Sequence, residues 1–169
     1  MVWETVVFAM LGSIMLLSKL VMELFPNVHL LGVLTMVYTV TFRRRALIPI
    51  YVYVFLNGLI AGFNLWWLPY LYIWTLLWGA TMLIPQRLPK RVRTFIYPVV
   101  CSLHGFLFGV LYAPVGAFAF GFGIEGIWAW IAAGGVFDII HGCSNLALGF
   151  LVLPISELLS RLVRRYGRG

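Results

Sequence analysis

The chain consists of long apolar stretches separated by short polar or basic breaks. A helix that crosses a bilayer core needs roughly 20 apolar residues, so a chain of this length accommodates about six such helices with short connections. The pattern predicts an all-α polytopic integral membrane protein, in which residues 1–169 form a single compact bundle of six transmembrane helices. The predicted spans are residues 6–25, 29–42, 46–62, 66–84, 95–112 and 136–159.

Residues 113–135 interrupt this pattern with many glycines and a single charge, at Glu125. An irregular backbone in contact with lipid would leave its polar groups without hydrogen-bond partners. We therefore expect this stretch to form an outer loop folded back onto the membrane surface, or a short re-entrant helix.

The composition agrees with a membrane protein, because 63% of the residues are hydrophobic and only 10% are charged. The formal net charge of +7 could suggest nucleic acid, but the basic residues cluster beside apolar segments, at 43–45, 87–93 and 161–168. Such clusters are typical of cytoplasmic flanks of membrane helices. They predict that both termini are cytoplasmic. They also predict that the chain interacts with the lipid bilayer and does not bind nucleic acid.

Three polar residues fall on one face of the last predicted span: Asp138, His141 and Asn145. Polar groups at membrane depth are costly unless they face protein or a cavity, so they mark a candidate site. Asp138 could instead cap the start of this span, after Gly134 and Gly135. A metal site is disfavoured because asparagine is a poor third ligand, and no catalytic motif is present, so we expect no metal, no cofactor and no enzyme activity.

Other candidate binding residues lie on the predicted outer side of the bundle. An aromatic stripe follows one face of the fourth span, at Trp67, Tyr70 and Trp74. Such a stripe serves packing or forms the wall of a pocket for a planar molecule. Further candidates are Asn57 and the outer residues His29 and Trp128. Asn57 is expected either to hydrogen-bond a neighbouring helix or to donate a hydrogen bond to a molecule in a pocket.

The first span carries small residues along one side, at Ala9, Gly12 and Ser13. Small residues let another helix approach closely. This face is predicted to dock a partner protein, and the alternative is that it packs within the chain itself.

Several short motifs carry a resemblance to a known family. They are Ala9-x-x-x-Ser13, residues 25–30 (FPNVHL), residues 69–74 (PYLYIW) and residues 136–142 (VFDIIHG). With six short spans, the chain resembles the substrate-binding S component of energy-coupling factor vitamin transporters. It departs from that family in having Ser13 in place of alanine, and Asp138 and His141 where other members carry Asn and Lys.

The resemblance implies a multi-pass protein of the bacterial plasma membrane that is not itself an enzyme. Such a protein captures a vitamin or related small micronutrient at the outer face. It docks through its first helix, here Ala9 and Ser13, with a transmembrane coupling protein and two ATPase subunits. The alternative interpretations are a non-catalytic membrane scaffold of the cell envelope and an intramembrane enzyme.

Overall fold

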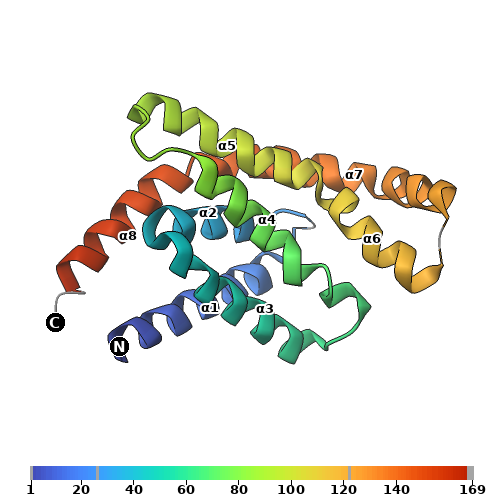
Figure 1. Cartoon of the computed structure of the whole chain (residues 1–169), viewed down its shortest axis with the longest axis horizontal. Helices are drawn as coiled ribbons and strands as arrows, with labels where there is room; N and C mark the ends of the chain where they lie inside the picture. The colour runs from blue at the N-terminus through green and yellow to red at the C-terminus, as the bar shows by residue number, and fades with distance from the viewer. Residues whose placement is uncertain (1, 26, 122, 167–169) are drawn as a thin grey trace.

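The computed structural model describes residues 2–25, 27–121 and 123–166, and every regular element in these ranges is helical (Figure 1). The all-α class is therefore confirmed. The elements are α1 Val2–Met22, α2 Leu31–Phe42, η1 Arg43–Ala46, α3 Leu47–Ala61, η2 Leu65–Trp67, α4 Tyr70–Leu83, α5 Lys90–Phe106, α6 Phe108–Phe120, α7 Ile124–Gly149 and α8 Val152–Tyr166.

Four helical stretches in the described part of the chain are long and apolar enough to cross a membrane: Val2–Met22, Leu31–Ala61, Lys90–Phe120 and Ile124–Gly149. The second stretch is not one straight helix, because Arg43 has a positive φ of 55° between α2 and α3. The fold is thus compatible with a membrane protein, and the six-span arrangement stays a prediction.

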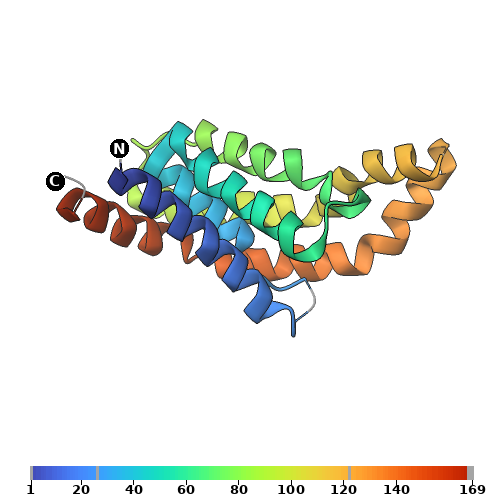
Figure 2. The same ribbon diagram turned by 90° about the horizontal axis from the view of Figure 1, so that it is seen from below.

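Residues 113–135, for which an outer loop or a short re-entrant helix was expected, are mostly helical. Helix α6 continues to Phe120 and α7 begins at Ile124, with a turn around Gly121, whose φ of 65° suits glycine. The backbone groups of this stretch therefore bond within two helices, which satisfies them without a loop at the membrane surface. The resulting α6–α7 hairpin extends to the end of the molecule opposite the two termini (Figures 1 and 2).

The ends of the other predicted spans also shift. The fifth span is broken at Leu107, where α5 gives way to α6, and the sixth is replaced by α7 and α8, which meet around Phe150. Both termini and the α4–α5 connection lie at one end of the molecule (Figure 1). The basic residues of the α4–α5 connection and of the end of α8 consequently share that end.

Large apolar side chains cover much of the outer surface. Leu24, Leu83 and Phe118 are each more than 80% exposed, and similar residues follow the outward side of α1. A protein in water rarely exposes apolar patches on this scale, whereas lipid tails accept them. The surface supports the assignment to a membrane.

Helices α5 and α7 share the most extensive contact in the fold, and glycines allow it. A Cβ atom added at Gly105 would lie 2.9 Å from the Cα atom of Gly142, and one added at Gly149 would lie 2.5 Å from the Cα atom of Pro98. Both neighbours are backbone atoms, which cannot rotate away. The two helix backbones therefore meet directly at these positions.

This contact predicts unequal effects of alanine at two glycines of α7. Gly149→Ala should lower the free energy of unfolding by about 1–3 kcal/mol, because it overpacks the contact with Pro98. Gly135→Ala should be neutral or stabilise by up to about 1 kcal/mol, because no atom lies within 4 Å of the added methyl and alanine favours helix. Denaturation of the two purified variants in the same detergent measures the difference, and equal stabilities would contradict the packing.

Candidate functional site

A cluster of aromatic rings occupies the middle of the bundle, and we call it the ring cluster. Its members come from α3, α4, α5, α6, α7 and the α1–α2 connection: Tyr53, Tyr70, Trp74, His104, Phe108, Tyr112, His141 and His29. Contacts between ring centroids run through it without a break. His29 lies 4.6 Å from His141, His141 lies 4.8 Å from Phe108, and Trp74 lies 5.8 Å from His104.

Helical spacing and the break at Leu107 position these rings. Tyr70 and Trp74 are one turn apart on α4, and Phe108 and Tyr112 are one turn apart on α6. Because α6 starts anew after Leu107, Phe108 lies close to both His104 and His141. The cluster thus joins residues that are distant in the sequence.

Six polar atoms in and beside the ring cluster are buried without a hydrogen-bond partner: Tyr53 Oη, Trp74 Nε1, His29 Nδ1, His104 Nδ1, His141 Nε2 and Asn57 Nδ2. Asn57 lies one turn after Tyr53 on α3, so it shares the inward face of that helix. A buried polar group without a partner costs about 1–3 kcal/mol, and native proteins contain few of them. A molecule bound at the cluster would complete these hydrogen bonds.

The hydrogen bond of His104 fixes which partner its free nitrogen needs. His104 Nε2 lies 3.2 Å from the carbonyl oxygen of Ile73, so in the neutral ring Nε2 is the donor. His104 Nδ1 is then an acceptor. Trp74 Nε1 and Asn57 Nδ2 are donors, so the cluster offers both kinds of group to a bound molecule.

Asp138 has a structural partner outside the ring cluster. It lies within α7, so it does not cap the start of that helix, which was the alternative role considered for it. Its Oδ1 accepts a hydrogen bond of 3.0 Å from the backbone N–H of Gly109. Gly109 is in the first turn of α6, where N–H groups have no helical partner. Asp138 therefore caps α6, and a Cβ atom at Gly109 would collide with its carboxylate.

Asn145 and two of the predicted tryptophans have hydrogen bonds or positions outside the ring cluster. Asn145 is fully buried and donates from Nδ2 to the carbonyl of Cys101, across the contact of α5 with α7, while its Oδ1 has no hydrogen-bond partner. Trp67 donates from Nε1 to the carbonyl of Val54. Trp128 is 66% exposed on the α6–α7 hairpin. The structure therefore brings together His29, Tyr70, Trp74 and His141 from the predicted set, and Asn57 is buried one turn from Tyr53.

The sequence-based set omitted four rings of the cluster. His104 was visible as a lone histidine in an apolar helix, but its neighbours come from α4 and α6. Tyr53 could have been found from its spacing of four to Asn57. No sequence pattern indicated Phe108 and Tyr112, because their positions in the cluster follow from the helix break at Leu107.

A shallow hollow of about 160 Å³ adjoins the ring cluster at His29. Lys19, Glu23 and Asn27 also line it, and Lys19 pairs with Glu23 at 2.6 Å. His29 thus faces the hollow and contacts His141 inside the cluster. Within the described ranges, no group of three histidine, cysteine or acidic side chains is arranged to hold a metal ion.

The small residues of α1 divide into two sets. A Cβ atom at Gly12 would lie 2.5 Å from Val52 Cγ1, so Gly12 packs against α3 within the chain. Ala9 is exposed and lines a surface groove of about 260 Å³ with Ile48 and Val52, and Ser13 donates its hydroxyl to the carbonyl of Ala9. Ala9 and Ser13 remain accessible to another helix.

Comparison of the chain with models of protein families, with curated proteins and with solved structures gave no significant match.

Proposed function

We propose that this chain is the membrane-embedded substrate-binding component of an energy-coupling factor importer, which captures a vitamin or related micronutrient at the outer face of a bacterial plasma membrane. The observation that carries the proposal is that six buried, unpartnered polar atoms lie in or beside a cluster of aromatic rings from six parts of the chain. Small-molecule sites have this composition, mostly apolar with a few polar groups aimed inward.

The chemistry of the ring cluster indicates the class of substrate. Rings with free donors at Trp74 and Asn57 and a free acceptor at His104 suit a planar heteroaromatic molecule that carries both acceptor and donor atoms. The two carboxylates beside the cluster in the described ranges, Asp138 and Glu23, are already bonded to Gly109 and to Lys19. A neutral molecule therefore fits better than a cation.

The membrane arrangement in this proposal follows the basic residues. With the positively charged end in the cytoplasm, both termini are cytoplasmic, the chain crosses the membrane six times, and the α6–α7 hairpin lies on the outer side. The hollow at His29 then offers the substrate a route to the ring cluster from outside. A transmembrane coupling protein and two ATPase subunits would supply the energy, since Ala9 and Ser13 leave a docking face on α1.

A thermal-shift screen of the purified chain against vitamins and heteroaromatic micronutrients tests the proposal. A true substrate at 100 times its Kd stabilises a protein by about 2.7 kcal/mol, which raises Tm by several degrees. We expect one compound to give this shift, and tagged chain from its native membrane to co-purify with an ATPase module. If no compound stabilises it and no ATPase associates, the proposal fails in favour of the scaffold interpretation.

A further inference from the structure

A cavity of about 480 Å³ lies between α8, the start of α5 and the end of α2, away from the ring cluster. Its lining is strongly polar. Three arginines, two serines and a glutamine surround it together with one carboxylate and two apolar side chains: Arg93, Arg161, Arg164, Ser156, Ser160, Gln86, Glu157, Val40 and Leu153. We call it the arginine cavity.

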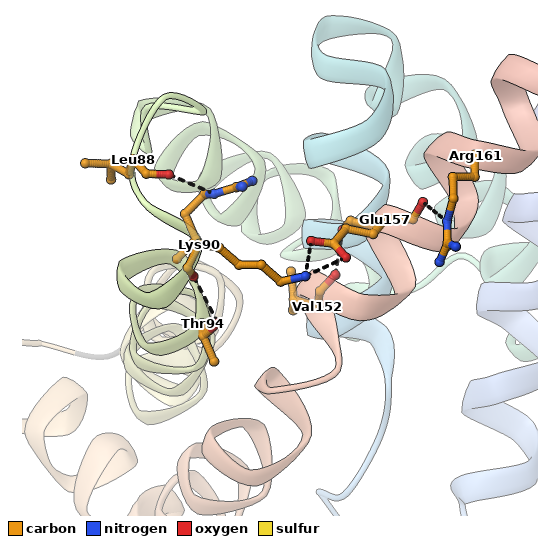
Figure 3. A network of polar contacts seen from close by, with 8 residues as sticks. Leu88, Lys90, Thr94, Val152, Glu157 and Arg161 are labelled. Carbon is orange, nitrogen blue, oxygen red and sulfur yellow. Dashed lines mark hydrogen bonds and ion pairs between the residues drawn. The ribbon is translucent and has the colours of Figure 1, made fainter.

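Its single carboxylate is already paired with a lysine outside the cavity. Lys90 Nζ lies 2.8 Å from Oε1 and 2.9 Å from Oε2 of Glu157, as Figure 3 shows. The hydrogen bond from Lys90 lowers the pKa of Glu157, and the positive charges of Arg93 and Arg161 lower it further, so this carboxylate is ionised at neutral pH.

Within the described ranges, the three guanidinium groups have no carboxylate in direct contact. Arg93 and Arg161 each donate from Nε to a backbone carbonyl, of Leu88 and of Glu157, which leaves their terminal nitrogens free. Figure 3 shows the bond of Arg161. Among the described residues, neither they nor Arg164 form an ion pair. Unpaired guanidinium groups around one cavity favour an anion with several oxygens, and a phosphate group matches their planar geometry.

Helix α8 places this cavity at the membrane surface. Leu158, Leu162 and Tyr166 are exposed at spacings of four along α8. Arg161 and Arg164 of the same helix line the cavity. An amphipathic helix of this kind lies in the membrane interface with its apolar side toward the acyl chains. The arginine cavity then lies at the depth of lipid headgroups.

We propose that the arginine cavity binds a phosphate group through Arg93, Arg161 and Arg164, and that its natural source is the headgroup of an anionic phospholipid. The site is independent of the substrate proposed for the ring cluster. Its occupation would fix α8 against the start of α5, because Arg161 and Arg164 come from α8 and Arg93 comes from α5.

Native mass spectrometry of the full chain, released from vesicles of phosphatidylcholine with phosphatidylglycerol, tests the site. We expect preferential retention of phosphatidylglycerol, and at least a fivefold loss of this preference in Arg93→Gln and in Arg164→Gln. Arg91→Gln is the matched control, since Arg91 is an exposed arginine of the same helix start that does not line the cavity. Its preference should stay within twofold of the unmodified chain.

The Tm of the chain in detergent, measured with each compound, distinguishes a lipid headgroup from a soluble phosphate as the bound group. A higher Tm with phosphatidylglycerol but not with inorganic phosphate or glycerol 3-phosphate supports the lipid. An equal rise with the soluble compounds, lost in Arg164→Gln, overturns the lipid as source and keeps the phosphate site. Equal losses in Arg91→Gln and Arg164→Gln, or no response to any phosphate compound, would overturn the site itself.

Discussion

Replacing His141 with leucine should lower the affinity for the substrate at least tenfold while leaving the ligand-free protein as stable as the unmodified chain or up to about 2 kcal/mol more stable. His141 is 1% exposed, and its Nε2 has no partner in the protein. Leucine is close to histidine in volume and has no polar atom, so it removes a buried unpaired group without opening a cavity. Titration calorimetry measures the affinity, and denaturation in detergent measures the stability.

The matched control is a buried polar group that already has its partner. Tyr38 is 2% exposed, and its hydroxyl donates a hydrogen bond of 3.0 Å to the carbonyl of Leu11. Tyr38→Phe should therefore lower the free energy of unfolding by about 0.5–1.5 kcal/mol and leave the affinity within twofold. If His141→Leu instead destabilises the protein and binds normally, His141 serves the fold and the ring cluster is no binding site.

The opposite effects expected at His141 and Tyr38 show what the structure adds to the sequence. Both residues are polar groups in otherwise apolar helices. Whether each has a hydrogen-bond partner depends on neighbouring helices. The carbonyl of Leu11, on α1, accepts the bond from Tyr38, whereas the ring of His141 packs against the rings of His29 and Phe108 and its Nε2 has no hydrogen-bond partner among the described residues.

Helical periodicity was sufficient for contacts within one helix. A spacing of four lets Lys19 and Glu23 pair, as they do at 2.6 Å, and it places Tyr70 and Trp74 on one face as predicted. Periodicity did not predict that residues 113–135 form the end of α6 and the start of α7, because the density of glycine suggested a loop or a short re-entrant helix. Glycines 134 and 135 lie inside α7 with open space around them. A long helix tolerates single residues of low helix propensity when its backbone hydrogen bonds are satisfied internally.

The break at Leu107 explains most of what the sequence could not predict about the site. No proline or glycine stands at residues 106–108, so local signals favour a continuous helix there. The break redirects Phe108 and Tyr112 into the ring cluster and exposes the N–H of Gly109 to Asp138. The role of Asp138 therefore changed from a candidate ligand to a cap for another helix, through contacts that are long-range in sequence.

Replacing Ala9 with leucine should reduce substrate uptake in cells at least tenfold while leaving substrate affinity and stability nearly unchanged. Ala9 is exposed on α1, and together with Ser13 it offers a surface on which the backbone of a partner helix can lie close. A leucine side chain there would hold the helices apart and weaken docking of the coupling protein. Uptake of labelled substrate and co-purification of the ATPase module measure the loss, and ligand titration measures the affinity.

Two further variants separate docking from folding. Ala147→Leu adds the same bulk to an exposed position on α7 and should leave uptake within twofold. Gly12→Leu should instead destabilise the chain and lose binding and uptake together, because its side chain would collide with Val52 and the carbonyl of Pro49. Normal uptake by Ala9→Leu would place the docking surface elsewhere, and a loss of substrate affinity in that variant would show that this face of α1 acts within the chain, as Gly12 does.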